Sequence, residues 1–372
     1  MLEAHLEEVK EFLRSSNEDV NIVVMPDFFL DRFISLNCNP SVFSRMVAEV
    51  AERKGGSIDG ISQTDFRGGN AVNTASALAS LDAKVTIIAC TDRLGVKLLK
   101  LYVKSPKINL SHVKILQKPS ITTALEFNTK NGKTNIMLRD VGSLSDFGPE
   151  NLNSADFEVI EKADCVCVFN WAGTRRFGTE LAQTVFHHAK MKGKGKTYYD
   201  TADPTPNREK ATKLMQKVLQ DKIVDILSLN ENEAVFYASL LDDEIGKTKQ
   251  KRGFENLARH SAKLLASRLS ARIDLHTTSF SATFTKNSET IVPAFQVQAL
   301  RATGAGDSWN AGNILGSLYK LSDEARLTLA NAVAAYYISN PEGKHPTRKE
   351  LIRFCNKMKK KQTTKTDKNQ IN

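Results

Sequence analysis

The sequence predicts an α/β protein with a mostly parallel sheet and helices on both faces of that sheet. Short continuous apolar runs, typical of strands buried on both sides, recur along the chain. Segments with the apolar spacing of helices separate them, for example around residues 176–191 and 207–220. The predicted strands are residues 21–25, 85–90, 163–169, 197–199 and 223–229. This alternation favours parallel strands whose ligands lie beyond the carboxyl ends.

Size and composition fit one large α/β domain with small appendages. The chain has 372 residues, of which 41% are hydrophobic and 25% charged, as is ordinary for a globular protein. Residues 2–14 carry their leucines on one stripe, so we assign residues 1–20 to an N-terminal helix that precedes a main domain at 21–360. Residues 361–372 are polar and basic, and we expect them to form a disordered tail.

The distribution of charge, the lack of long apolar runs and the spacing of the cysteines argue against a nucleic-acid-binding protein, a membrane protein or a metal site built from cysteines. The net charge is +10, but residues 344–372 contain ten Lys or Arg against two Asp or Glu, so +8 lies at the C-terminus. A nucleic-acid partner is therefore unlikely for the main domain. No apolar run approaches ~18 residues and no secretory signal is visible, so we expect no membrane partner. The five cysteines have no metal-ligand spacing, which favours reduced core cysteines and a cytoplasmic location.

The first half of the main domain pairs strand ends with polar or glycine turns. Asp27 and Asp31 follow the strand 21–25, and Asp27, directly after Pro26, is also a typical turn former. Residues 41–54 have helical spacing. Gly68 and Gly69 then lead into an Ala-rich helix at 70–79, where their N–H groups could approach ligand hydroxyls or simply form a glycine cap.

A β-rich segment interrupts the α/β alternation at about residues 112–140. Residues 121–127 and 134–138 alternate in polarity and flank Asn131-Gly132, which is a strong signal for a two-residue hairpin turn. Arg139 and Asp140 end this segment. They are candidates for substrate contact, or else form an ion pair in solvent.

Asn230 and Glu233 open a helix directly after the strand 223–229. Their three-residue spacing puts both side chains on one face of the first helical turn. Since Mg²⁺ is held mainly through water and substrate phosphates, one Asn and one Glu could suffice as its protein partners. The alternative is a capping box, which has the same spacing.

The segment Arg301 to Gly312 is the strongest candidate for a catalytic motif. Its glycines fall between a strand-like run at 291–300 and a helical pattern at 313–320, where a helix N-terminus can hold an anion. Asp307 would repel such an anion unless it has another task, such as accepting the proton of an attacking hydroxyl. An ordinary helix start with an acidic first turn is the alternative. Neither a Walker A motif nor a G-x-G-x-x-G fingerprint is present.

These motifs together resemble the ribokinase/PfkB family of carbohydrate and nucleoside kinases. T-G-A-G-D-x-x-x-A-G at 303–312 resembles its C-terminal signature, and R-G-G-N-A-V-N at 67–73 resembles its N-terminal one. Asn-x-x-Glu at 230–233 resembles its third motif, and Asn331-Ala332 its late nucleotide-side segment. The order and spacing match over about residues 22–352.

The resemblance implies a ribokinase-like three-layer α/β/α fold with a small β-rich lid. The lid segments would be about residues 33–66 and 112–140, although the helical pattern at 41–54 departs from the lid strands of most relatives. The lid would cover the acceptor and exclude water, and a homodimer could form through it. The donor would be ATP, or else ADP, with Mg²⁺, and the acceptor a sugar, a sugar phosphate or a nucleoside.

The resemblance also implies roles for individual residues. Asp307 would be the base, with the backbone N–H groups at 304–306 as the anion hole. Asp200 and Asp203 are both candidates for an acid near phosphates or metal. The complete expected set is Asp307, Gly304, Ala305 and Gly306 for catalysis; Asp31, Gly68, Gly69, Asn73 and Arg139 for the acceptor; Asn230, Thr277, Thr303 and Asn331 for the nucleotide; and Glu233 for Mg²⁺ through water.

Arg301 departs from the family pattern, which often has an aspartate there that helps to hold a monovalent cation. Our hypothesis is that the Arg301 guanidinium supplies the positive charge itself, so K⁺ is not expected as a cofactor. A side chain pointing to solvent is the alternative. Two other functions are left open: a non-catalytic relative that senses a sugar or nucleotide, and nucleic-acid binding through the basic C-terminus.

Overall fold

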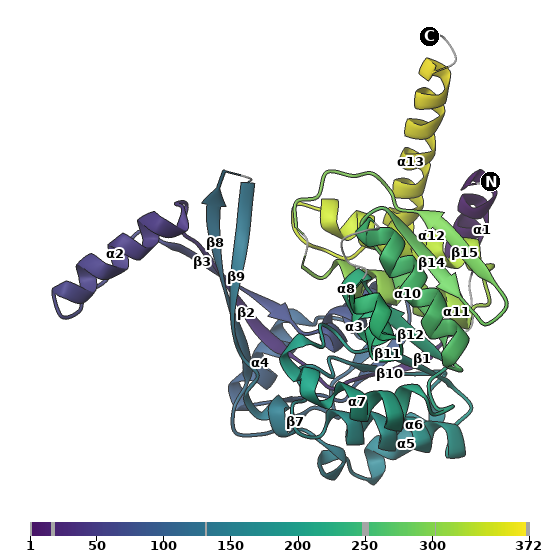
Figure 1. Cartoon of the computed structure of the whole chain (residues 1–372), viewed down its shortest axis with the longest axis horizontal. Helices are drawn as coiled ribbons and strands as arrows, with labels where there is room; N and C mark the ends of the chain where they lie inside the picture. Colours follow the sequence, from purple (N-terminus) through teal and green to yellow (C-terminus); the bar gives the residue numbers. More distant parts are fainter. Residues whose placement is uncertain (1, 16–18, 131, 248–252, 302, 370–372) are drawn as a thin grey trace.

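The computed structural model describes residues 2–15, 19–130, 132–247, 253–301 and 303–369. Asn131 of the predicted hairpin turn, Ala302 of the glycine-rich motif and residues 370–372 of the tail lie outside these ranges. The described chain forms a three-layer α/β/α body with a smaller sheet projecting from one side (Figure 1). The predicted fold class is confirmed.

Nine strands of the described chain form the central sheet, in the order β15-β14-β13-β12-β11-β10-β1-β4-β6. Those from β6 to β13 are mutually parallel, and the hairpin β14–β15 adds an antiparallel edge. Their bounds are β1 (Asn21–Met25), β4 (Lys84–Ile87), β6 (Ile108–Asn109), β10 (Cys165–Phe169), β11 (Lys196–Asp200), β12 (Ile226–Leu229), β13 (Arg272–His276), β14 (Phe280–Phe284) and β15 (Glu289–Pro293). A separate short pair joins β5 (Cys90–Thr91) to β7 (Lys114–Ile115).

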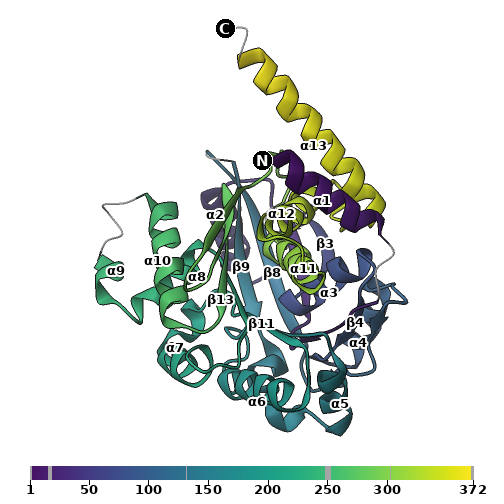
Figure 2. The ribbon, with the colours of Figure 1, turned by 90° about the vertical axis from the view of Figure 1, so that its right-hand side faces the viewer.

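Helices cover both faces of this sheet (Figure 2). One layer consists of α1 (Leu2–Arg14), α3 (Asn70–Ser80), α4 (Arg93–Tyr102), α11 (Ala305–Leu318), α12 (Asp323–Ser339) and α13 (Arg348–Asn369). The other consists of α5 (Ser154–Lys162), α6 (Gly178–Lys192), α7 (Ala211–Leu214), α8 (Glu231–Ser239), α9 (Asp243–Lys247) and α10 (Phe254–Arg268). Strand residues alternate between the two cores, as in β1, where Ile22 and Val24 face the first layer and Val23 and Met25 the second.

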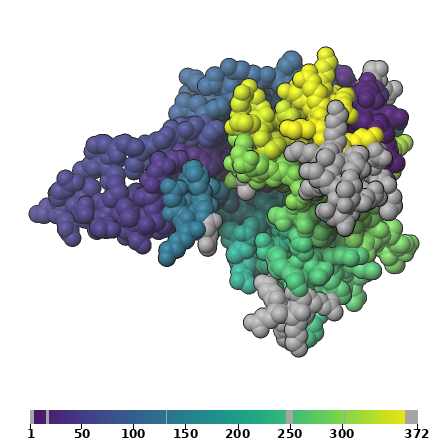
Figure 3. All heavy atoms as spheres, turned by 90° about the horizontal axis from the view of Figure 1, so that it is seen from above, coloured from purple at the N-terminus to yellow at the C-terminus, as the bar shows by residue number. Residues whose placement is uncertain are grey.

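The projecting sheet occupies the place expected for the lid, and we use that name for it. It has the strand order β3-β2-β8-β9, with β2 (Phe29–Ser35), β3 (Ser62–Gly68), β8 (Ser120–Thr129) and β9 (Gly132–Asp140). The predicted helix at 41–54 is α2 (Pro40–Glu52), capped by the Asn39 side chain, and it sits at the outer end of the lid, away from the body (Figure 3). The β8–β9 hairpin was predicted from its alternation, whereas β2 and β3, which flank α2, were not predicted as strands.

A buried ionic cluster joins the α11–α12 layer to β13. The Asp274 carboxylate accepts hydrogen bonds from Arg272 and Asn313 at 2.8 Å, and Arg326 lies at 3.2 Å. Asp274 and Arg326 are essentially inaccessible to solvent. The paired guanidinium groups lower the pKa of Asp274 to about 2 despite its burial. The cluster therefore fixes the helix that carries the glycine-rich motif against the sheet.

One predicted segment differs from the structure. The expected strand at 291–300 ends at Pro293, because Pro293 has no N–H group and the following apolar residues, Phe295 and Val297, pack against the helical layer of α12 and α13 instead. The last helix, α13, is described as far as Asn369, and the disordered tail at 361–372 stays a prediction. Among the described residues, no helix has the length and apolarity needed to span a membrane.

Candidate active site

The carboxyl ends of the parallel strands meet around one polar cavity of about 310 Å³. Asp27 follows β1, Asn170 follows β10, Asp200 ends β11, Asn230 follows β12 and His276 ends β13, and all five line the cavity. This is where an open parallel sheet holds its ligands. Polar residues at or after the ends of five parallel strands therefore surround one space.

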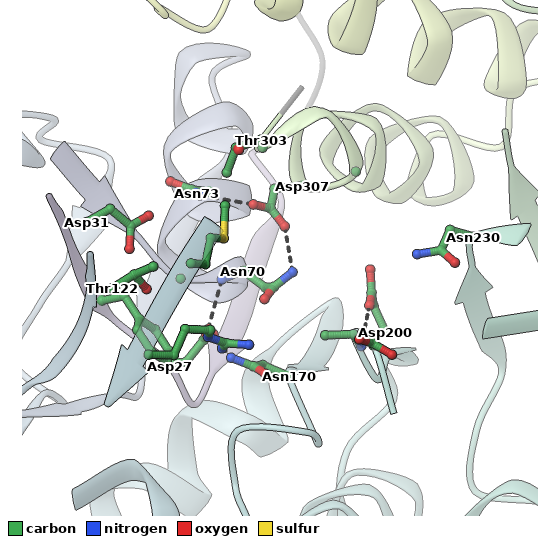
Figure 4. Close-up of a pocket in the computed structure, with 18 of the residues that line it drawn as sticks. Asp27, Asp31, Asn70, Asn73, Thr122, Asn170, Asp200, Asn230, Thr303 and Asp307 are labelled. Carbon is green, nitrogen blue, oxygen red and sulfur yellow. Dashed lines mark hydrogen bonds between the residues drawn. The ribbon is translucent and has the colours of Figure 1, made fainter. Parts of the chain in front are cut away.

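Asp307 lies in the first turn of α11, between two asparagines of α3. Its Oδ1 accepts a hydrogen bond from Asn70 Nδ2 and its Oδ2 accepts one from Asn73 Nδ2, both at 2.9 Å (Figure 4). Burial raises the pKa of Asp307 well above its ordinary value, and the neighbouring Asp200 and Asp27 add to this, while the two amides oppose it. The carboxylate is thus buried, oriented by both oxygens and made more basic.

The N-terminus of α11 begins beside this carboxylate. Gly304 has a left-handed backbone (φ 84°), and a Cβ at this position would lie 2.9 Å from the Tyr337 hydroxyl oxygen. Thr303, Gly304 and Gly306 line the cavity, and Ala305 is the first residue of the helix. The unpaired N–H groups of this first turn lie at the positive end of the helix dipole, so they can bind an anion next to Asp307.

Asp27 clamps the N-terminus of α3. Its fully buried carboxylate accepts hydrogen bonds from the backbone N–H groups of Asn70 (2.9 Å) and Ala71 (2.8 Å) and from Asn170 Nδ2 (2.8 Å). Gly69 caps this helix with a positive φ of 95°. A glycine is needed there because of that φ and because a Cβ would lie 2.9 Å from the Asp27 carbonyl oxygen. Asp27 is therefore more than a turn former, since it holds the helix that carries both asparagines.

The lid supplies one wall of the cavity. Asp31 of β2 and Thr122 of β8 face inward (Figure 4), and Met137 and Arg139 of β9 also line the cavity. Burial raises the pKa of Asp31 to about 6, against a hydrogen bond from Thr122. The Asp31 carboxylate occupies the space that a Cβ at Gly68 would need, which explains the glycine in β3. The Arg139 guanidinium lies 5.1 Å from the centre of the Phe29 ring, and Asp140 instead accepts the N–H of Gly142.

Acidic groups gather at the end of the cavity opposite the lid. Asn230 and Glu233 form a true capping box, since Asn230 Oδ1 accepts the Glu233 N–H at 3.0 Å and Glu233 Oε2 accepts the Asn230 N–H at 2.9 Å. Both also line the cavity, so the structural and functional interpretations are compatible. Burial raises the pKa of Glu233 well above its usual value, and Asp200 and Asp203 add to the rise. Among the described residues no three acidic, histidine or cysteine side chains are placed to hold a metal ion directly, so a divalent cation here would be held largely through water.

His276 faces the same end. Its ring packs against Trp309 in a tilted arrangement with 4.9 Å between ring centres, and its buried Nε2 has no hydrogen-bond partner among the described residues. Burial lowers the pKa of His276 to about 4, so the imidazole is neutral. A neutral ring beside Gly306 can contact a polar ligand without adding charge.

Two expected nucleotide-binding residues lie outside the cavity lining. The Thr277 hydroxyl donates to the Phe280 carbonyl within the β13–β14 turn. Asn331 of α12 is buried, where its Oδ1 accepts from Ser281 and Trp309 and its Nδ2 donates to the Pro293 carbonyl. Their roles toward a nucleotide remain predictions.

Arg301 turns toward the segment that follows α12. Its Nη2 donates to the Pro341 carbonyl oxygen at 2.8 Å, and the guanidinium lies 5.8 Å from the centre of the Tyr337 ring. It is only partly exposed and lines a second cavity, described below, rather than the first.

Asn70 and Asn170 are site residues that sequence reasoning did not single out. Asn70 stands inside the quoted motif, but only the packing of α3 against α11 shows that its amide reaches Asp307. Asn170 directly follows the predicted strand 163–169 and has a positive φ of 51°. The rule that drew attention to Asp200 and Asn230, a polar residue after a predicted strand, could have found it.

Known proteins resemble this chain in sequence and in fold. Residues 42–350 match the model of the pfkB family carbohydrate kinase. A ribokinase of Haemophilus influenzae is 24% identical over 292 residues, which cover 77% of this chain and 86% of the relative.

Two solved structures share the fold over nearly their whole length. The ribokinase of Arabidopsis thaliana complexed with ribose and ATP has a TM-score of 0.66 at 18% identity, with 91% of this chain and 98% of that chain covered. The adenosine kinase of Sinorhizobium meliloti has a TM-score of 0.67 at 17% identity, with 92% and 99% covered. The architecture is therefore the ribokinase-like one.

Proposed function

Because this chain belongs to the pfkB family of carbohydrate kinases, we propose that it transfers the terminal phosphoryl group of ATP to a hydroxyl group of a sugar, a sugar phosphate or a nucleoside. The observation that carries the proposal is the Asp307 carboxylate, held by Asn70 and Asn73 beside the N-terminus of α11. A base beside an anion site is the arrangement that in-line attack on a phosphate requires. ADP is the second donor to be tested.

Asp307 acts as the general base. The acceptor oxygen loses its proton to the carboxylate while it forms a bond to the γ-phosphorus. The bond between that phosphorus and the oxygen bridging it to the β-phosphate breaks, and its electron pair leaves with ADP. The raised pKa of Asp307 supports this role, because a more basic carboxylate accepts the proton more readily.

The first turn of α11 stabilises the negative charge of the group in transfer. The N–H groups near Gly304, Ala305 and Gly306 have no earlier helical turn to bond, and small side chains let phosphate oxygens approach. These donors are fixed before the reaction because the Asp274 cluster holds α11 on the sheet.

Mg²⁺ fits the acidic end of the cavity. Glu233 and either Asp200 or Asp203 would hold the ion through water together with the donor phosphates. When bound, it would neutralise charge on those phosphates. The raised pKa of Glu233 supports this assignment, since a cation would relieve the repulsion among these carboxyl groups.

The acceptor is assigned to the lid side of the cavity. Asp31 and Arg139 line it from the lid, and Asn73 and Gly69 line it from α3 and its N-cap. Hydrogen-bond donors and acceptors would therefore surround the hydroxyl groups of a bound polyol. The lid would keep water from competing for the phosphoryl group.

Activity should not require K⁺. Arg301 brings a permanent positive charge to the position before the glycine turn and donates to the carbonyl oxygen of Pro341. A strong K⁺ requirement in steady-state assays would contradict this assignment.

The deciding experiment is a panel of sugars, sugar phosphates, nucleosides and inositol incubated with the full-length chain, Mg²⁺ and either ATP or ADP. Nucleotide consumption that depends on one class of acceptor supports the kinase. A chain that binds acceptor and nucleotide in thermal-shift assays but never consumes the nucleotide would instead be a sensor.

Exposed apolar residues on the lid favour a second copy of the chain as a partner. Along β8 and β9, Ile121, Ile136 and Leu138 are exposed by 39%, 48% and 56%. A homodimer that buries this face accounts for such apolar exposure. Sedimentation of the wild-type chain and of an Ile136→Lys variant checks this: a dimer that becomes monomeric supports it, and an unaffected oligomeric state opposes it.

A further inference from the structure

A second cavity, of about 630 Å³, adjoins the first. Asp31, Asn73 and Thr303 line both cavities. Asn73 also holds Asp307 by hydrogen bonding, so the two spaces meet beside the proposed base. A molecule that places a hydroxyl group at Asp307 can therefore extend past Asn73 into the second cavity.

Three residues that line this second cavity carry a buried nitrogen atom without a hydrogen-bond partner. Among the described residues that line it, Arg67 Nε, Arg301 Nε and His345 Nε2 are buried and have no hydrogen-bond partner. A buried polar group without a partner is costly, most of all when it is charged. Burial lowers the pKa of Arg67, and only Tyr337 and Asp307 oppose this. Both guanidinium groups therefore have an Nε donor without a partner, although Arg301 Nη2 donates to the Pro341 carbonyl oxygen.

The acidic groups around the cavity do not satisfy these arginines. Glu126 is paired with Lys133 at 2.7 Å, and Glu342 is paired with Lys344. Asp31 accepts a hydrogen bond from Thr122. The positive charges of Arg67 and Arg301 are therefore left without a carboxylate partner among these groups.

The chain places these arginines at the two turns that build the site. Arg67 precedes Gly68-Gly69 at the end of β3, and Arg301 lies just before Thr303 and the N-terminus of α11. Each charge is therefore fixed relative to the reacting groups. Phe33 and Phe66 form an apolar wall in the same cavity, with 5.5 Å between their ring centres.

His345 adds a hydrogen-bond acceptor for a hydroxyl group. Ser308 gives its own hydroxyl proton to the Gly304 carbonyl, so His345 Nδ1, 3.3 Å away, is the donor to Ser308 Oγ. Burial lowers the pKa of His345 well below its usual value, so the ring is neutral and Nε2 of this cavity-lining residue is then an acceptor without a partner among the described residues. The cavity as a whole suits a ligand with an anionic end and hydroxyl groups.

We propose that the second cavity binds a phosphate monoester of the acceptor through Arg67 and Arg301, so that the substrate class is a sugar phosphate with a free hydroxyl group directed toward Asp307. This inference rests on the proposed kinase function. A planar guanidinium group is well suited to phosphate oxygens because it offers paired donors.

The test compares ribose and fructose with their terminal phosphate monoesters, using the full-length chain, ATP and Mg²⁺. A charge-assisted contact should raise kcat/KM for the monoester by about 10- to 100-fold over the parent sugar. Arg67→Gln and Arg301→Gln should each remove much of this preference by raising KM for the monoester. Arg268→Gln, an exposed arginine on α10, is the matched control.

The outcomes separate the two proposals. If no acceptor causes nucleotide consumption, the kinase function itself fails. If parent sugars or nucleosides react as well as the monoesters, the kinase stands and the sugar phosphate assignment is wrong. If inorganic phosphate instead activates the reaction of parent sugars, the cavity is an effector site and the assignment is also overturned. Arg301→Lys keeps the charge and should therefore retain part of the preference for the monoester that Arg301→Gln loses. This comparison tests the proposal even if Arg67→Gln does not fold.

Discussion

Replacing Gly304 by alanine should separate the anion hole from general folding effects. At φ 84°, a residue with a side chain costs about 1–2 kcal/mol of stability. The new Cβ would also lie 2.9 Å from Tyr337 Oη and 3.0 Å from Cε1, so the first turn of α11 must shift. Because displaced anion-hole donors lower turnover by about 10²–10³-fold, kcat of Gly304→Ala should fall by about that factor.

Gly60→Ala is the matched control. Gly60 has a similar φ of 77°, but a Cβ there meets no atom within 4 Å, and it lies in the loop after α2 at the outer end of the lid. Both variants should lose the backbone cost of about 1–2 kcal/mol in urea unfolding, and Gly304→Ala should lose more because of its contact with Tyr337. Only Gly304→Ala should lose turnover in a coupled assay of ADP release. Equal turnover numbers for the two variants would refute the anion-hole assignment.

Three further predictions concern buried acids. Burial raises the pKa of Asp31 to about 6, so its protonation as the pH falls through that value should raise KM for the acceptor. Asp31→Asn should remove this pH dependence. A variant whose KM still rises at acid pH would argue against contact between Asp31 and the acceptor. Glu233→Gln should raise the Mg²⁺ concentration needed for half-maximal activity, and an unchanged Mg²⁺ titration would exclude Glu233 from the metal site. Asp274→Asn should lower the free energy of unfolding by about 3–5 kcal/mol, because it removes the buried carboxylate shared by Arg272 and Arg326 and leaves Arg326 only the partly exposed Asp323. Urea unfolding measures that loss, and wild-type stability would show that the pair contributes little. With its pKa lowered to about 2, ionised Asp274 stabilises the wild-type fold above the ordinary carboxyl range, and this contribution disappears as the pH falls through about 2.

The layered body could be predicted because its signals are local. Each parallel strand is a continuous apolar run, and the polar residues after the strands meet simply because the carboxyl ends share one edge. The capping box of Asn230 and Glu233 is equally local. The strand predicted at 291–300 was wrong beyond Pro293. Its apolar residues have the same spacing whether they pair in a sheet or, like Phe295, pack against helices.

The contacts that assemble the site could not be predicted from the sequence. Asn70 and Asn73 reach Asp307 only because α3 packs beside α11, across more than 230 residues of chain. Asp27 could not be distinguished from a turn former until the N-terminus of α3 was seen against it. Arg67 stands in a quoted motif, yet its unsatisfied Nε depends on neighbours from the lid and from the segment after α12.

The most direct test of the account is the turnover of Asp307→Asn with saturating ATP, Mg²⁺ and the best acceptor. The amide keeps the shape of the side chain but cannot take the acceptor proton, so kcat should fall by about 10²–10⁴-fold. Thermal-shift titrations should still detect binding of both substrates, and Asp221→Asn, a half-exposed surface residue, should behave like the wild type. Near-normal turnover of Asp307→Asn would contradict the assignment of Asp307 as the base.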